Sequence, residues 1–440
     1  MIDPILDLVG WMTARAPWKL LDRFLHVRTQ FRELSSNART LILTSFFWTL
    51  PFAFSAVYLR IFMKEQGLSA IEIGTISSIQ VMFQVIGSFC GGYVADRLGW
   101  KRSLIAIDFL LWPAVLLTYA TSTSYSGFLI GACLEGLQWT VSPAWISLLV
   151  TGTAPSRRPF LFALSGLHFM GGGLLVPFAA PLIRTWGVSS TSRVMLAAGA
   201  VLTMTGILIR LRTVRDTTPP AARRVPAGVL ADFMHGHRQA LRAIIARPGL
   251  RLMFLYWLVI RIAMIVWFTY GYLYLTDPRG LGFDKARISI LPLINSAMVV
   301  ASLLFVNARI GADNIHRFFY AGLALRMVYQ LTIIVAPAGA MYLVMGAMVA
   351  EGLGFGILWS TTNAYWANQM KDSERPRITA LANVLFLLIT MPVPAIAGAF
   401  YVLNPRLPFV GMLALFATAF AMQVRMDLRD RARKRPGSTA

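Results

Sequence analysis

The stretch GGYVADRLGWKRS, residues 91–103, lies between two long apolar segments and holds one acidic and three basic residues. The chain around it is 57% hydrophobic and only 14% charged, with a mean hydropathy of +0.62. Globular soluble domains carry about 25% charged residues. A soluble protein this apolar would expose more hydrophobic surface than it could cover. The composition therefore predicts an integral membrane protein.

Apolar segments long enough to cross a bilayer, which takes about 20 mostly apolar residues, recur along the chain. We expect twelve, near 41–63, 71–95, 102–121, 126–152, 159–183, 190–210, 250–275, 286–306, 316–336, 339–366, 377–401 and 407–424. This predicts an all-α polytopic membrane protein. Its domains are an N-terminal amphipathic cytoplasmic segment (1–40), an N-terminal six-helix bundle (41–210), a cytoplasmic linker (211–249) with a short helix at 227–246, a C-terminal six-helix bundle (250–424) and a basic cytoplasmic tail (425–440).

Lys and Arg concentrate in alternate loops. With the N-terminus in the cytoplasm, the cytoplasmic segments, counted with Arg210 at the end of the sixth span, hold 31 of the 41 Lys and Arg residues, and the opposite loops hold 7. Cytoplasmic loops of membrane proteins are enriched in these residues. We therefore expect both termini in the cytoplasm, with the protein in an inner or plasma membrane. The same bias explains the net charge of +22 without a nucleic-acid partner.

The two halves of the chain resemble each other. SRRPFLFAL (156–164) aligns with SERPRITAL (373–381) at an offset of 217 residues, and Pro177 and Pro394 keep that offset. Two six-helix halves in parallel repeat are typical of one large class of transporters, whose binding site lies between the halves near the membrane midplane.

The opening stretch has a more specific resemblance. The spacing of Gly92, Asp96, Arg97, Gly99, Lys101 and Arg102 resembles the signature between the second and third helices of the major facilitator superfamily. The resemblance implies two pseudo-symmetric six-helix bundles that transport by alternating access. It also implies that Asp96 faces the start of the eleventh helix, where Ser373 is a candidate N-cap, and that the three bases surround Asp96 as a gate. The alternative is an ordinary loop with a solvated Asp96.

Ionisable residues at mid-bilayer are costly and usually functional. At about 1.5 Å per residue, Glu135 lies roughly 14 Å into the fourth span, Glu351 roughly 18 Å into the tenth and Arg261 roughly 16 Å into the seventh. By resemblance these spans line the central cavity. We expect Glu351 to pair with Arg261 and Glu135 to carry a proton. The alternative is that both carboxylates are structural, and Asp108 and Arg326, in spans three and nine, are predicted to be support charges.

Aromatic and amide side chains crowd the same spans. The candidates for the substrate cavity are Trp48, Trp139, Trp267, Tyr270, Trp359 and Asn363. An aromatic, partly charged cavity suits an amphipathic organic molecule, although some of these aromatic residues belong to the interfacial belt.

These features predict a secondary active transporter, with proton-coupled symport of a small organic solute as the first hypothesis. Drug antiporters of the superfamily carry an Arg four residues before a Gly in the fourth helix, where this chain has Ala132 before Gly136. Proton-coupled efflux of a drug or metabolite remains an alternative, as does a lipid flippase or transporter-like sensor. The chain has no catalytic constellation, so we expect no enzyme, cofactor or metal. We expect a monomer in the lipid bilayer, with protons and a small-molecule substrate as partners.

Overall fold

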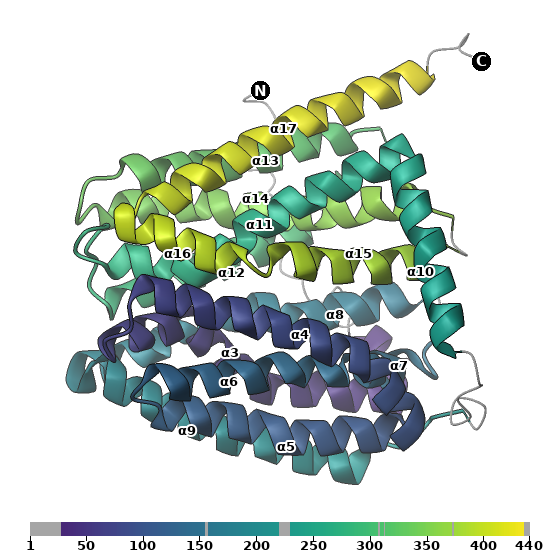
Figure 1. The fold of residues 1–440 in the computed structure, drawn as a ribbon, viewed down its shortest axis with the longest axis horizontal. Coiled ribbons are helices and arrows are strands. Elements are labelled where there is room, and N and C mark those ends of the chain that lie inside the picture. Colours follow the sequence, from purple (N-terminus) through teal and green to yellow (C-terminus); the bar gives the residue numbers. More distant parts are fainter. Residues whose placement is uncertain are drawn as a thin grey trace.

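The computed structural model describes residues 28–154, 157–219, 229–306, 309–311, 313–371 and 374–434, and these are helical with no strand among them. Most of the predicted N-terminal amphipathic segment, and Ser373, lie outside the described residues. Figure 1 shows the helices running roughly parallel in two groups, the earlier half of the chain below and the later half above.

The first half consists of α3 (Ser36–Glu65), α4 (Ala70–Leu98), α5 (Trp100–Thr121), α6 (Tyr125–Leu137), η1 (Gln138–Val141), α7 (Ser142–Val150), α8 (Arg158–Gly171), η3 (Gly172–Ala179) and α9 (Ala180–Thr213). The second half consists of α10 (Val229–Ala246), α11 (Pro248–Thr276), η5 (Arg287–Ser289), α12 (Ile290–Ala301), η6 (Ser302–Val306), α13 (Ile315–Val335), α14 (Met341–Asn368), α15 (Arg375–Thr390), α16 (Val393–Leu403) and α17 (Leu407–Lys434). The helix α10 falls close to the one expected at 227–246.

Within the described residues, ten helices are long and apolar enough to cross a membrane. Two features of the helices explain why ten are found and twelve were expected. The fourth span is divided into α6, η1 and α7, because Pro143 lacks the N–H that an α-helical turn needs and a 3-10 turn precedes it. The fifth and sixth spans join at Gly187, whose φ of 73° makes a turn inside α9.

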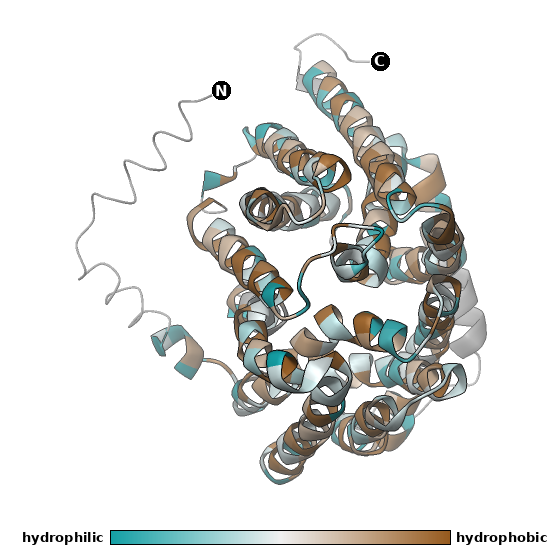
Figure 2. Ribbon diagram, turned by 90° about the vertical axis from the view of Figure 1, so that its left-hand side faces the viewer, coloured by the Kyte–Doolittle hydropathy of each residue, from teal (hydrophilic) through white to brown (hydrophobic). Residues whose placement is uncertain are grey.

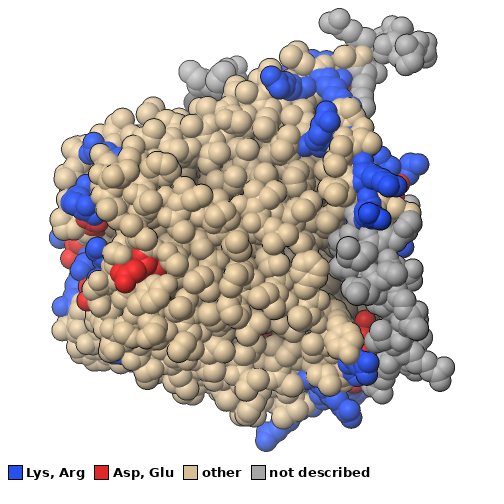
Figure 3. Space-filling view, in the orientation of Figure 1, with Lys and Arg blue, Asp and Glu red and all other residues tan. Residues whose placement is uncertain are grey.

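The surface agrees with a membrane location. In the view of Figure 3, a broad band without charged side chains separates clusters of charged residues at the two ends of the molecule. Figure 2, seen along the bundle, shows hydrophobic residues predominating along the helices. We call the end that carries α10 the α10 end, and the opposite end the distal end.

The two halves are joined by hydrogen bonds toward the distal end. Lys285 Nζ lies 2.8 Å from a carboxylate oxygen of Glu65, and the Tyr58 hydroxyl donates to the Lys285 carbonyl at 3.1 Å. The Tyr270 hydroxyl lies 2.9 Å from the carbonyl oxygens of both Ala70 and Pro394. Helices α4 and α16 therefore meet closely across the halves.

Gly74 on α4 permits the close approach of α4 to α16. A Cβ added at Gly74 would lie 2.3 Å from the Tyr270 hydroxyl and 2.4 Å from the Pro394 carbonyl oxygen, closer than real Cβ contacts. The distal end is thus closed by backbone packing as well as by an ion pair.

Candidate functional site

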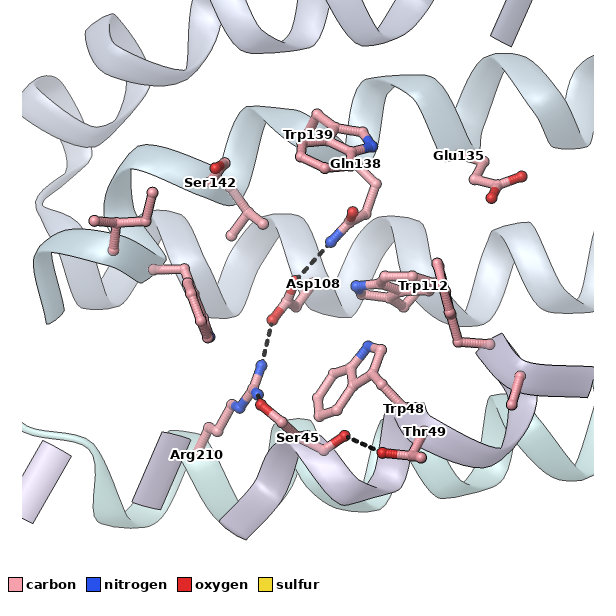
Figure 4. A pocket seen from close by; sticks show the side chains of 15 residues that line it. Ser45, Trp48, Thr49, Asp108, Trp112, Glu135, Gln138, Trp139, Ser142 and Arg210 are labelled. Carbon is pink, nitrogen blue, oxygen red and sulfur yellow. Dashed lines mark hydrogen bonds and ion pairs between the residues drawn. The ribbon is translucent and has the colours of Figure 1, made fainter. Parts of the chain in front are cut away.

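A pocket of about 260 Å³ lies within the first half, between α3, α5, α9 and the broken fourth span. The break places Gln138, Trp139 and Ser142 on the pocket wall, opposite Trp48 and Asp108 (Figure 4). The pocket combines several indole rings with a few charged groups. Such a lining, mostly apolar with a small number of polar groups, is typical of a site for a small organic molecule.

A buried ion pair forms one wall of this pocket. Arg210 on α9 and Asp108 on α5 approach to 3.0 Å, and their side chains are only 4% and 2% exposed. Arg210 Nε donates to the Thr44 hydroxyl at 2.8 Å, and a second guanidinium nitrogen donates to the Ser45 hydroxyl at 3.3 Å. The Gln138 amide lies 3.5 Å from Asp108 (Figure 4). Buried charges are stable only when paired and hydrogen-bonded in this way.

The Trp48 indole packs on the same cation. The Arg210 guanidinium carbon lies 4.0 Å from the Trp48 ring centroid, a cation–π contact, and Trp112 meets Trp48 edge-on at 6.3 Å. On the other side, a Cβ at Gly206 would lie 2.6 Å from Trp48 Cζ3, so only glycine leaves room for the ring. Trp48 is thereby held at the pocket wall, with 7% of its surface exposed.

Glu135 lines the same pocket from α6. One of its carboxylate oxygens accepts a hydrogen bond from the Tyr119 hydroxyl at 2.8 Å. Arg60, at the outer part of α3, donates to the Gln80 side chain at 3.4 Å. Within the described part of the chain Glu135 forms no ion pair, unlike Asp108. The Gln80 side chain also bonds Glu135, and Arg60 is near enough to attract its charge. Glu135 is therefore a pocket carboxylate bonded to neutral side chains, with a cation nearby that forms no ion pair with it.

The partner expected for Glu351 was wrong. Two nitrogens of Arg326, on α13, bond the two Glu351 oxygens at 3.2 and 2.7 Å, and both side chains are buried. Arg261 instead lies 3.5 Å from the Asn383 side chain, with its guanidinium 5.4 Å from the rings of Trp257 and Phe386. Spans nine and ten are adjacent in the second half, so their charges meet there.

The six candidate cavity residues separate into two groups. Trp48 and Trp139 line the pocket. The other four lie outside it: Trp267 packs on Tyr329 at 5.4 Å, Tyr270 is buried in the contact between the halves, Trp359 lies beside Trp257 at 6.5 Å, and the Asn363 amide donates to the Trp359 carbonyl. The expectation that Tyr270 faces the cavity is therefore corrected, because its hydroxyl joins α4 to α16.

The motif at 91–103 connects α4 to α5. Gly99 has φ 85°, a left-handed conformation that glycine adopts without strain, and so turns the chain between the two helices. Asp96 is half-buried and has no ion-pair partner among the described residues, and Arg97 lies over the Tyr93 ring at 5.3 Å. The three bases of the motif do not hold Asp96 in this structure, and a Cβ at Gly92 would meet no atom within 4 Å.

The model of the Major Facilitator Superfamily matches residues 40–343. The chain belongs to the major facilitator superfamily. It is a multi-pass integral membrane protein.

The relatives within the superfamily are distant. The uncharacterized MFS-type transporter YqjV of Bacillus subtilis is 23% identical over 42% of this chain and 44% of its own length. The probable nitrate/nitrite transporter NarK2 of Mycobacterium tuberculosis is 24% identical over 37% of this chain and 40% of its own. The matched region thus spans less than half of these two relatives. The hexuronate transporter of B. subtilis is 20% identical over 68% of this chain and 71% of its own.

Solved structures show the same fold. The crystal structure of the nucleoside transporter NupG superposes with a TM-score of 0.66 over 91% of this chain and 100% of that chain, at 14% identity. A POT family transporter in complex with 5-aminolevulinic acid gives a TM-score of 0.68 over 92% and 100%, at 12% identity. At these identities the likeness concerns the fold.

Arg210 is the charged pocket residue that the sequence analysis missed. The sixth span was expected to end at residue 210, and Arg210 was assigned to the cytoplasmic Lys and Arg residues. The helix α9 continues to Thr213, which places Arg210 inside the bundle. The available signal was the unpaired Asp108 in a neighbouring span, because a buried carboxylate requires a partner.

Proposed function

We propose that the protein is a secondary active transporter that carries a small amphipathic organic solute together with a proton, by alternating access. The observation that carries this proposal is Glu135, a pocket carboxylate bonded to the Tyr119 hydroxyl, with no ion-pair partner among the described residues. An ionised carboxylate without an ion-pair partner is costly at mid-membrane, and protonation removes its charge. Glu135 is therefore suited to bind and release a proton as the pocket changes its exposure.

The pocket wall supports an amphipathic substrate. The indole rings of Trp48, Trp112, Trp139 and Trp145 offer flat apolar surfaces, while Gln138 and Arg210 offer polar groups. The relatives and structural neighbours are named as transporters of small solutes, among them hexuronate, nucleosides and nitrate or nitrite. These relatives favour a solute carrier over a lipid flippase.

The two ends of the bundle support alternating access. The halves are bonded at the distal end through Glu65, Lys285 and Tyr270, whereas Asp96 at the α10 end has no ion-pair partner among the described residues. We assign the α10 end to the cytoplasm because Lys and Arg concentrate there. The structure then corresponds to an inward-facing state, and Asp96 would be bonded when the cytoplasmic end closes.

Transport in proteoliposomes tests the proposal. Protein reconstituted with a pH-sensitive dye inside the vesicles is offered glucuronate, uridine, a dipeptide and nitrate in turn. We expect one of these additions to drive protons in the same direction as the solute. Proton movement against the solute would assign antiport, and no proton movement with measurable uptake would contradict proton coupling.

The variant Glu135→Gln isolates the proton site. We expect it to lose solute-driven proton movement, because the amide cannot take up a proton at neutral pH. Glu33→Gln is the matched control, since Glu33 pairs with Arg157 outside the pocket. A Glu135→Gln protein that still moves protons with its solute would remove Glu135 from the mechanism.

A further inference from the structure

Trp48 carries a hydrogen-bond donor for which no described residue supplies an acceptor. Its side chain is 7% exposed and lines the pocket, yet Nε1–H has no partner among the described residues. A buried donor without an acceptor costs about 1–3 kcal/mol. Buried indole N–H groups usually find a partner. An acceptor atom of a bound molecule would supply the one that is missing here.

Arg210 adds further donors at the same place. A guanidinium has five N–H groups, and three hydrogen bonds account for the contacts of Arg210 with Thr44, Ser45 and Asp108. The guanidinium also stacks on Trp48, and both residues line the pocket, so a cation and the Trp48 N–H lie together at one wall. Charge-assisted bonds from arginine favour planar oxyanions, above all carboxylates.

We propose that this wall is a subsite for the carboxylate group of an amphipathic organic acid, whose apolar body lies on the indoles of Trp139 and Trp145. The inference rests on the proposed transport function and names its substrate class. The site lies wholly within the first half, formed by α3, α5, α9 and the broken fourth span. Arg210 stays paired with Asp108 and donates its remaining N–H groups to the ligand.

Glu135 couples this subsite to the proton. A ligand carboxylate and an ionised Glu135 in one pocket repel each other, so anion binding favours protonated Glu135. The titratable and charged groups facing it are Tyr119 and Asp108 on α5, Arg210 on α9 and, through Gln80, Arg60 on α3. The Arg210 charge is compensated by Asp108. The anion and one proton would thus enter the pocket together.

Binding to the purified full-length protein in nanodiscs tests the subsite. The probes are hexanoate, benzoate, 3-phenylpropionate and glucuronate, with 3-phenylpropanol and 3-phenylpropylamine as isosteres that lack the carboxylate. We expect at least one carboxylate to bind, and 3-phenylpropionate to bind at least tenfold more tightly than its two isosteres. If no carboxylate binds, or if the amine or alcohol binds as tightly, the subsite is wrong. This comparison uses the wild-type protein and needs no variant.

The variant Trp48→Phe removes the N–H and keeps a ring beside Arg210. Losing a hydrogen bond to a charged group should weaken carboxylate binding about tenfold or more and leave the alcohol and amine unchanged. Trp186→Phe is the matched control, because Trp186 is 53% exposed and lies outside the pocket. Equal carboxylate affinity in wild type and Trp48→Phe would overturn the assignment.

The subsite and the transport function can fail separately. Trp48-dependent carboxylate binding without solute-driven proton movement would contradict symport and leave the subsite standing. Proton-coupled uptake of a solute without a carboxylate, unaffected by Trp48→Phe, would contradict the subsite and leave symport standing.

Discussion

Among the described residues, each half of the bundle contains one ion pair with both side chains buried, and the two pairs differ in their surroundings. Asp108 and Arg210 line a pocket of about 260 Å³ and share hydroxyl and amide neighbours. Arg326 and Glu351 are joined by two bonds, and the Arg326 guanidinium lies 4.8 Å from the Phe416 ring and 5.5 Å from the Phe355 ring. The repeat conserves the position of a charge in spans three and nine, but not its sign, its partner or its access to a cavity.

This difference separates two roles for a buried charge. A pair closed in by aromatic rings and helices serves the packing of its own half. A pair beside a cavity can meet water or a ligand, and its remaining donors are available to that ligand. The pair in the first half lies at a pocket, as the proposed binding site requires, whereas aromatic rings pack on the pair in the second half.

The largest expected effect on folding stability is at the Arg326–Glu351 pair. Glu351→Gln keeps the size of the side chain and leaves the Arg326 charge without its carboxylate. Breaking a buried pair from one side costs about 3–5 kcal/mol of folding stability. We expect a large fall in the thermal unfolding temperature in detergent. The double variant Arg326→Met with Glu351→Leu should recover most of it, because apolar replacements of both partners are tolerated. An unchanged unfolding temperature for Glu351→Gln would contradict a structural role for the pair.

An intermediate effect on folding stability is expected at the Asp108–Arg210 pair, which lines the pocket. Asp108→Asn also removes one carboxylate, but Arg210 keeps the Thr44 and Ser45 hydroxyls and borders a cavity that can admit water. We expect a stability loss of about 1–3 kcal/mol, smaller than for Glu351→Gln, and at least a tenfold loss of solute uptake. The same two assays, run on both amide variants, make the comparison. Equal stability losses would show that the cavity does not distinguish the pairs.

The sequence predicted the helical class, the two halves and the family, because these depend on apolar length and on a motif contiguous in the chain. It also placed Glu135, Asp108, Arg326 and Glu351 at depths inside the membrane. Depth follows from counting residues along a helix. The pairing does not, because it depends on which faces of two distant helices meet.

Two particular errors show this limit. Glu351 was paired with Arg261 because both were deep in spans expected to face the cavity, whereas the adjacent helix α13 presents Arg326. Arg210 was taken for a loop residue because the sixth span was ended three residues before α9 ends. The pocket itself arises from a 3-10 turn before Pro143, which apolar patterning alone does not reveal.

The smallest effect is expected at an exposed pair that serves as the reference for both buried ones. Arg247 precedes α11 and Glu374 precedes α15, and two hydrogen bonds of 2.6 and 3.1 Å join them, with side chains 40% and 36% exposed. The hydrogen bond from Arg247 lowers the pKa of Glu374 below its ordinary value of 4.5. The stabilisation from this pair is therefore complete above the unfolded pKa and is lost as the pH falls through the lower folded value.

The variant Glu374→Gln measures how much the exposed Arg247–Glu374 pair contributes to stability. Exposed ion pairs are screened by water and contribute little, so we expect a lower unfolding temperature at pH 7 by a smaller amount than for either amide variant above. The difference from wild type should shrink as the pH falls through the lowered folded pKa of Glu374, below which this carboxyl is protonated in both states. A loss as large as that of Glu351→Gln would mean that burial does not set the strength of these pairs, and the contrast between the two halves would lose its physical basis.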